Sequence, residues 1–225
     1  MAAFAQGSGD GAITDDGCPV ELYRQLKAGD EIGLIQGLAP PGGSILDLGA
    51  GAGRLAEPLA EAGFAVTAVD ESAEMLAEIR GDVAPFRSRI EDLDLGQRFD
   101  LVLLASYLLN APAAEDRGAL LGACVRHLKP GGATAIQVRG PGILRDLTDF
   151  EREVDGIHDW VDSYRRHGPL VTMTLRTEWE GRRWVQTFTH RYLPESELRR
   201  ELADSGLTFE RWLDAGPEWF LARPS

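Results

Sequence analysis

The stretch ILDLGAGAGR, residues 45–54, decides the fold of this chain, because an apolar strand runs into a glycine-rich turn and then into a helical pattern. Gly49, Gly51 and Gly53 permit positive φ angles and let the backbone approach a ligand where any Cβ atom would collide. The periodicity of residues 55–62 predicts a helix that begins at this loop. The stretch therefore predicts a site for a nucleotide-like ligand, with the first N–H groups of the helix directed at it.

The glycine spacing distinguishes two classes of ligand. A dinucleotide-binding loop has the pattern G-x-G-x-x-G, whereas this loop has G-x-G-x-G followed by Arg54. Asp47 also interrupts the apolar strand and places a carboxylate near its carboxyl end, where it can accept hydrogen bonds from the ligand or the loop. The spacing argues against a nicotinamide-dependent oxidoreductase.

A second predicted strand, residues 64–69, leads to Asp70, about twenty residues past the loop, where nucleotide-binding folds place the acid that holds ribose hydroxyls. Asp70 could instead end a solvated strand or cap the helix that starts near Ser72.

Four motifs, in this order, resemble those of the class I S-adenosylmethionine-dependent methyltransferases. They are LDLGAGAG at residues 46–53, VDESAEML at 69–76, FDLVLLA at 99–105 and RHLKPGG at 126–132. The resemblance covers about residues 44–140. It implies a Rossmann-like α/β fold with a seven-stranded, mostly parallel sheet, a reversed final strand and helices on both faces.

The predicted elements agree with this fold class. Strands near residues 44–48, 64–69, 83–87, 99–105 and 132–139 alternate with helices near 53–62, 72–80 and 113–127. Such alternation predicts a parallel sheet with right-handed crossovers.

We expect a single domain with five parts. A flexible leader, residues 1–17, precedes N-terminal helices in 18–43 and the cofactor-binding core, 44–140. Residues 141–193 form a substrate-cover insertion after strand five, with a β-hairpin formed by runs 170–179 and 183–192. A C-terminal helix and two strands follow in residues 194–225.

The resemblance implies S-adenosylmethionine as cofactor, S-adenosylhomocysteine as product, and no metal. It assigns the methionine portion to the loop residues, the ribose to Asp70, and the adenine face to Met75. Arg89 stands where the family usually has an acid, so the contact with the adenine amine is left to Ile90, Glu91 or Asp92. The expected cofactor-binding residues are Tyr23, Asp47, Gly49, Ala50, Gly51, Gly53, Asp70, Glu71, Met75, Ile90, Glu91, Asp92, Ala105 and Ser106.

The catalytic residues are unknown from the sequence, because methyl transfer from a sulfonium depends mainly on alignment and needs no obligatory side chain. The candidates are Tyr23, Tyr107, His158, His167 and His190. Each histidine could accept a proton from the nucleophile, or could be an ordinary surface or core residue.

Further roles follow from sequence position. We expect His158 and His167 to flank a helix that contains Trp160 and Tyr164, and His127 to be structural. Tyr107 and Asn110 could orient a polar acceptor or start a surface helix.

Arg139, at the end of strand five, could hold a substrate carboxylate or pair with Glu178. The tryptophans Trp160, Trp179 and Trp184 suit an apolar cover over the substrate.

Composition and net charge limit the kinds of partner that we expect for this protein. The net charge of −13 predicts no nucleic-acid partner, and the basic cluster Arg182, Arg183 and Arg191 is interpreted as a solvated strand edge. No apolar run approaches a membrane span, and residues 1–7 lack a secretion signal, so we expect a cytoplasmic protein. Cys18 and Cys124 are expected to be free thiols.

The leading hypothesis is a methyltransferase that acts on an O or N nucleophile of a small molecule. The alternative is a sensor or scaffold that binds the cofactor without transferring its methyl group. A homodimer is possible, and the sequence does not name the acceptor.

Overall fold

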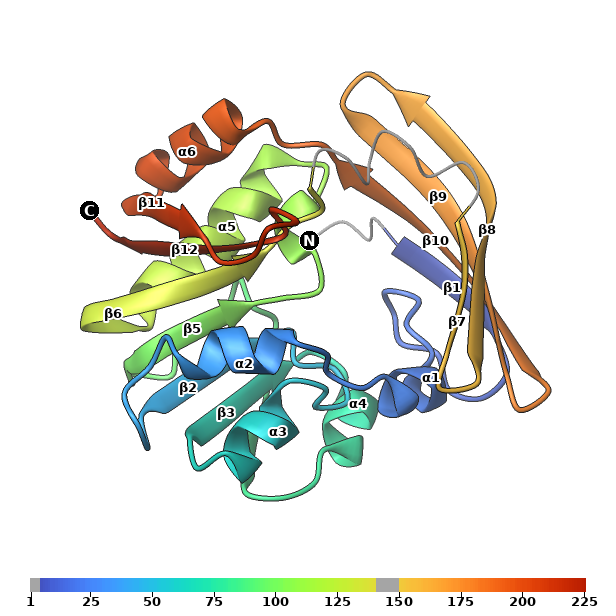
Figure 1. Cartoon of the computed structure of the whole chain (residues 1–225), viewed down its shortest axis with the longest axis horizontal. Coiled ribbons are helices and arrows are strands. Elements are labelled where there is room, and N and C mark those ends of the chain that lie inside the picture. The colour runs from blue at the N-terminus through green and yellow to red at the C-terminus, as the bar shows by residue number, and fades with distance from the viewer. Residues whose placement is uncertain (1–4, 141–149) are drawn as a thin grey trace.

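The computed structural model describes residues 5–140 and 150–225, which form two β-sheets with helices around the larger one (Figure 1). The larger sheet has seven strands in the order β11-β12-β6-β5-β2-β3-β4. Its strands are β2 (Ser44–Leu48), β3 (Ala65–Asp70), β4 (Val83–Arg87), β5 (Phe99–Leu104), β6 (Leu128–Gln137), β11 (Leu207–Trp212) and β12 (Trp219–Pro224). This Rossmann-like sheet confirms the expected fold class.

The direction of each strand agrees with the sequence pattern. Strands β4, β3, β2, β5 and β6 pair in parallel, and β12 runs antiparallel to β6 and to β11. Leu46 and Leu48 of β2 pack into one apolar cluster, and Ile45 packs into another on the opposite face. Both faces are therefore buried, as continuous apolar runs in parallel strands predict.

Helices cover the two faces of this sheet. Helices α5 (Ala114–Arg126) and α6 (Glu195–Asp204) supply apolar residues to one cluster, while α2 (Glu31–Gln36) and α3 (Ala56–Glu61) supply the other. Helices α1 (Val20–Gln25) and α4 (Ala73–Glu78) and the 3₁₀ turn η1 (Leu108–Asn110) complete the described helices. No helix in the described part of the chain is long and apolar enough to cross a membrane.

The second sheet is antiparallel, with five strands in the order β1-β10-β9-β8-β7. Its strands are β1 (Ala5–Gly9), β7 (Glu151–Val154), β8 (Ile157–His167), β9 (Leu170–Trp179) and β10 (Arg182–Arg191). The two runs expected to pair do so as β9 and β10, but within a larger sheet than the expected hairpin. Residues 141–149 of the expected insertion lie outside the described residues.

The predicted helix between His158 and His167 is wrong, because this segment is strand β8. A β-bulge between Val161 and Ser163 shifts the alternation by one residue. Ile157, Val161 and Tyr164 are consequently spaced by four and three residues, which imitates a helical pattern in the sequence.

The leader expected at residues 1–17 is also corrected, because residues 5–9 form β1 along the edge of β10. An added Cβ at Gly7 would lie 2.0 Å from the carbonyl oxygen of Gly17, so the chain passes very close to itself here. The strand is held by backbone pairing and contains no apolar alternation, which is why its sequence, AQGSG, gave no signal.

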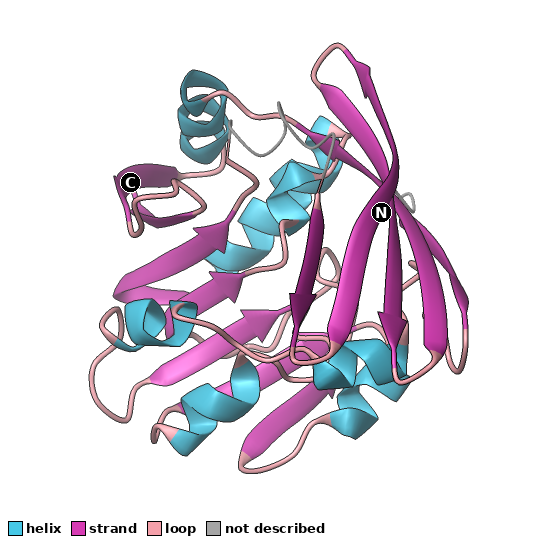
Figure 2. Cartoon of the chain, turned by 45° about the vertical axis from the view of Figure 1, so that its right-hand side comes forward, coloured by secondary structure: helices cyan, strands magenta, loops and turns pink. Residues whose placement is uncertain are grey.

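The second sheet faces the edge of the large sheet where the parallel strands end (Figures 1 and 2). Asn110 links the two: its side-chain amide donates to the carbonyl of Arg191, and its oxygen accepts from the backbone N–H of Arg139. Both polar groups of Asn110 are thus used by the backbone, which makes it a structural residue. Its expected alternatives, an orienter of the acceptor or the start of a surface helix, do not fit this buried position.

Candidate active site

The glycine-rich loop lies at the carboxyl end of β2 and is held by its neighbour β3. Gly49, Gly51 and Gly53 have φ angles of 71°, 55° and 89°, the conformation that favours glycine. The N–H groups of Gly49 and Ala50 both donate to the carbonyl of Val69 at 2.9 Å. Helix α3 (Ala56–Glu61) confirms the predicted helix to within one residue at each end, but the Glu57 N–H is already used by the Gly53 carbonyl and Pro58 has none, so few N–H groups at its start are free for a ligand.

Asp47 is buried directly beneath this loop, with 1% of its surface exposed. Its Oδ1 atom accepts no hydrogen bond from any described residue, which is costly for a buried carboxylate. The pKa of Asp47 is raised to about 7, chiefly by burial; the Arg54 charge lowers it, and the Asp70 charge adds a smaller rise. The site therefore contains a buried acceptor that a cationic or hydrogen-bond-donating ligand would satisfy.

Asp70, at the end of β3, organises the same loop. Its carboxylate accepts from the N–H of Gly51 at 2.8 Å and from the N–H of Ser72 at 2.9 Å. Burial raises its pKa, while these two hydrogen bonds lower it. The cap of helix α4 is Ser72, whose Oγ accepts from Met75, so Asp70 is not the cap. A carboxylate has about four acceptor positions, so Asp70 can still accept hydroxyl donors.

Tyr23 comes from α1 and covers the loop. Its ring lies 3.8 Å from where a Cβ of Gly51 would stand, and its hydroxyl accepts from Gln186 of β10 at 3.4 Å. Burial raises the pKa of Tyr23 well above its usual value, so its hydroxyl remains neutral. The expected adenine residue Met75 is buried in the small cluster against which Tyr23 packs.

Only part of the segment that follows β4 lies beside the glycine-rich loop. Ile90 is buried, with a methyl group 3.6 Å from where a Cβ of Gly49 would stand. Glu91 forms an ion pair with Arg89, and Asp92 is exposed. Glu71 is exposed next to Asp70, and partial burial of its carboxyl raises its pKa. Of the three candidates for the adenine amine, Ile90 is therefore the nearest to the loop.

At the end of β5, Ala105 is buried and Ser106 is exposed. Ser106 and Tyr107 have φ angles of 55° and 62°, a conformation that costs a non-glycine residue about 1–2 kcal/mol. The N–H of Ser106 donates to the side chain of Gln137 in β6 at 3.0 Å. This turn directs Tyr107 toward the second sheet, where it meets Arg139 and His190.

The four histidines lie in different surroundings. His127 is buried and bonds the backbone of Ala123 and Leu95, so it is structural as expected. His158 of β8 bonds Glu151 of the edge strand β7 at 2.7 Å, and His167 is exposed. Only His190 lies near Tyr107, with ring centroids 6.3 Å apart.

His190 is a poor proton acceptor. Its Nδ1 atom accepts from Nε of Arg139 at 3.1 Å, so its own proton is on Nε2. Burial first, and then the Arg139 charge, lower the pKa of His190 to about 3. The imidazole is therefore neutral at physiological pH and is not available as a general base.

Several other expectations are resolved by contacts. Glu178 pairs with Arg183, so Arg139 does not take Glu178 as its partner. Trp184 is 1% exposed and donates to the carbonyl of Asp10, which makes it a core residue of the second sheet.

The basic cluster is neutralised, with Arg182 paired to Glu21, Arg183 to Glu178 and Arg191 to Glu197. Cys18 and Cys124 form no disulfide. Within the described residues, no group of three His, Cys, Asp or Glu side chains is arranged to hold a metal ion.

Sequence reasoning missed two residues of the site. Gln186, in β10, bonds both the Gly17 carbonyl and Tyr23, and Glu218, just before β12, lies 3.5 Å from the Tyr107 hydroxyl. Neither belongs to a motif, and each reaches the site only through the pairing of distant strands. A buried carboxylate beneath a glycine-rich loop at the carboxyl edge of a Rossmann-like sheet is typical of nucleotide-binding proteins of the α/β class.

Comparison with known proteins shows what the central segment of the chain is similar to. Residues 45–132 match the family model described as a methyltransferase domain. A ubiquinone biosynthesis O-methyltransferase of Paramagnetospirillum magneticum is 41% identical over 96 residues, 40% of this chain and 37% of that protein. A cypemycin N-terminal methyltransferase of a Streptomyces species is 39% identical over 106 residues, 44% of this chain and 43% of that protein. The matches thus span less than half the length of these relatives.

Among solved structures, the CcbJ methyltransferase of Streptomyces caelestis superposes with a TM-score of 0.76 at 21% identity, and covers 92% of this chain and 96% of that chain. At this identity the likeness shows a shared fold, and it extends over both sheets. In its central segment the chain is thus similar to known methyltransferases, and in its fold it is similar to solved S-adenosylmethionine-dependent methyltransferases.

Proposed function

We propose that this chain is an S-adenosylmethionine-dependent methyltransferase that moves a methyl group to an O or N nucleophile of a small molecule. The proposal is supported by the match to the family model and by the names of the two relatives, one an O-methyltransferase and the other an N-terminal methyltransferase. The alternative, a sensor or scaffold without methyl transfer, has no support among these relatives.

The observation that carries the proposal is the buried Asp47 with its unpartnered Oδ1 atom. The methionine end of the cofactor carries an ammonium group, which would satisfy this oxygen and lower the pKa of the carboxyl. Gly51 presents open backbone beside it, because an added Cβ would meet only the Tyr23 ring at ordinary contact distance. The residues present therefore fit the cofactor.

The other binding roles follow from the same edge of the sheet. Asp70 holds the loop by the Gly51 N–H and retains acceptor positions for the ribose hydroxyls. Tyr23 excludes water from the loop, and its neutral hydroxyl is oriented by Gln186. Ile90 and Met75 provide the apolar surroundings of the adenine, and Ala105 and Ser106 flank the methionine end. The carboxylates of Glu71, Glu91 and Asp92 are the remaining candidates for polar contacts.

When bound, the cofactor supplies an activated methyl on a sulfonium, and displacement by the nucleophile disperses positive charge. The protein's contribution is alignment, which can provide on the order of 7–11 kcal/mol in favourable cases. His190 cannot remove a proton here, and on β8 His158 pairs with Glu151 while His167 is exposed. Tyr107 is left as the candidate for contacting the acceptor. The cytoplasmic location and the homodimer stay predictions.

The test is calorimetric titration of the protein with S-adenosylmethionine, S-adenosylhomocysteine and NADH. We expect micromolar binding of the first two and none of NADH. Gly51→Ala is expected to weaken that binding by on the order of tenfold or more, because its Cβ occupies the ligand's space.

Gly63→Ala is the matched control, because Gly63 also has a positive φ, at 92°, but lies in open space after α3. Both variants bear a backbone cost of roughly 1–2 kcal/mol, so only Gly51→Ala should change affinity. Equal affinities in the two variants, or saturable NADH binding, would refute the cofactor placement. Tight binding with no methyl lost to broad acceptor panels would favour the sensor.

A further inference from the structure

Arg139 is the central residue of a polar cluster at the junction of the two sheets. Its guanidinium carbon lies 4.1 Å from the centroid of the Tyr107 ring and 5.9 Å from that of Phe188. Its Nε donates to Nδ1 of His190 at 3.1 Å. Three separate elements, the β5 turn, the end of β6 and β10, therefore hold one guanidinium in a defined orientation.

This guanidinium has no anionic partner within the part of the chain that the structure describes. No carboxylate of residues 5–140 and 150–225 lies within 4.0 Å of its nitrogens, and its expected partner Glu178 bonds Arg183 instead. Burial lowers the pKa of Arg139, and the Glu218 and Tyr107 groups only partly oppose this effect. A desolvated cation without a partner is costly unless a ligand completes it.

The way in which Arg139 is held favours an anion. His190 occupies Nε and the aromatic ring covers one face, which leaves the two terminal nitrogens as the ligand-binding edge. Two terminal N–H groups of arginine match the paired oxygens of a carboxylate or a phosphate. His190 serves as a positioning residue, because its neutral ring accepts from Arg139 without adding charge.

The backbone beneath Tyr107 supports a ligand-binding role. Ser106 and Tyr107 both adopt the left-handed conformation, an unusual pair for residues other than glycine. Strain of this kind persists where the surroundings require it, which is most often at functional sites. Here it places the Tyr107 ring against the guanidinium.

We propose that the acceptor of this methyltransferase carries an anionic group, a carboxylate or a phosphate ester, which Arg139 binds through its terminal nitrogens. The inference rests on the proposed function, because it assigns the acceptor end of the same site. The inference is compatible with the net charge of −13, because the attraction for the anion would come from one partly buried cation at the site.

The test uses the protein loaded with S-adenosylhomocysteine and four probes: benzoate, phenyl phosphate, and the neutral benzamide and phenol. Affinities are measured by calorimetry at constant ionic strength. We expect benzoate or phenyl phosphate to bind at least tenfold more tightly than its neutral counterpart, and the preferred anion distinguishes carboxylate from phosphate. Equal affinity for anions and neutral probes would overturn the proposal.

Arg139→Gln should abolish the preference for anions, and Arg139→Lys, which keeps the charge but loses the two-pronged edge, should weaken anion binding by about tenfold. Arg176→Gln is the control, because Arg176 is exposed on β9 and pairs with Asp162 of β8. The affinity of each variant for S-adenosylhomocysteine shows whether the variant is folded and its cofactor site is intact. If the wild-type protein did not bind S-adenosylhomocysteine, the proposed function would be refuted separately from this inference. Unchanged anion preference in both Arg139 variants would refute this inference.

Discussion

At the residue scale, Asp47 shows how the site departs from the usual behaviour of a carboxylate. Its folded pKa of about 7 lies above the ordinary value of 3.8, chiefly because of burial. Between these values the folded protein binds more protons than the unfolded chain, so Asp47 makes the protein less stable as the pH rises through that window. The protein maintains this cost at the place where a ligand ammonium would remove it.

Asp47→Asn is therefore expected to change the pH dependence of stability. Each pKa unit corresponds to about 1.4 kcal/mol. The difference in the free energy of unfolding, variant minus wild type, should therefore increase by up to about 4 kcal/mol between pH 4 and pH 7.5. Denaturant unfolding at a series of pH values measures this difference. Saturating S-adenosylhomocysteine should reduce the gain, and parallel curves for the two proteins would show that Asp47 titrates normally.

At the element scale, strand β1 decides how the second sheet meets the loop. It pairs with β10 from Ala5 to Gly9, and Gly17 packs against Gly7. Gln186 of β10 then donates both to the carbonyl of Gly17 and to the hydroxyl of Tyr23. The N-terminal segment and Tyr23 are thus joined to one strand of the second sheet.

Gly7→Ala should release this segment, because the added Cβ would lie 2.0 Å from the backbone oxygen of Gly17. We expect amide hydrogen exchange in peptides covering residues 5–19 to become faster by on the order of tenfold or more, with weaker binding of S-adenosylhomocysteine. Ser8→Ala is the control, because Ser8 is exposed on the same strand. Unchanged exchange in Gly7→Ala would mean that the segment is not held by this contact.

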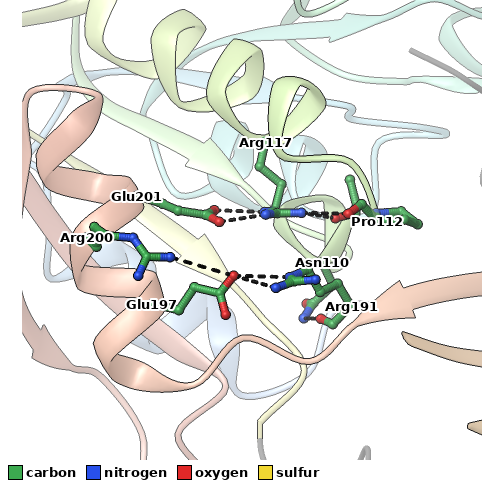
Figure 3. A network of polar contacts seen from close by, with 8 residues as sticks. Asn110, Pro112, Arg117, Arg191, Glu197, Arg200 and Glu201 are labelled. Carbon is green, nitrogen blue, oxygen red and sulfur yellow. Dashed lines mark hydrogen bonds and ion pairs between the residues drawn. The ribbon is translucent and has the colours of Figure 1, made fainter. Parts of the chain in front are cut away.

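At the scale of the whole molecule, a polar network joins α5 and α6 to the end of β10 (Figure 3). Arg117, 2% exposed, donates through two nitrogens to Glu201 at 2.7 and 2.6 Å, and also to the carbonyls of Ala111 and Pro112. Arg191 of β10 pairs with Glu197 at 2.6 Å. The network fixes helix α6 to helix α5 and to strand β10 of the second sheet.

Glu201→Gln should destabilise the whole chain, because it leaves a buried guanidinium without its carboxylate. We expect a loss of about 3–5 kcal/mol in the free energy of unfolding, measured by denaturant titration. Glu195→Gln, the same substitution on the same helix, removes the exposed ion pair with Arg199 and keeps a side-chain oxygen that can accept from Trp212, so it should leave the transition midpoint unchanged. Equal losses of unfolding free energy in the two variants would show that the burial of Arg117 does not make its ion pair with Glu201 more important than an exposed pair.

The candidate site was predictable where it follows from local sequence. Asp47, the glycine loop and Asp70 are close to strand ends, so alternation of strands and helices was enough to bring them to one edge. Strand β8 was not predictable, because its bulge imitates a helical spacing, and β1 was not, because backbone pairing needs no side-chain pattern.

The sequence by itself determined the strands of the large sheet and the loop, because apolar periodicity, glycine positions and short connections act between residues that are near in the chain. Only the tertiary structure decided that Tyr23 meets Gln186, that Asn110 joins the sheets, and that Arg139 meets Tyr107 and His190. These contacts join residues up to 163 positions apart. Which residues meet in these contacts depends on how the two complete sheets pack together, and no local sequence pattern predicts that packing.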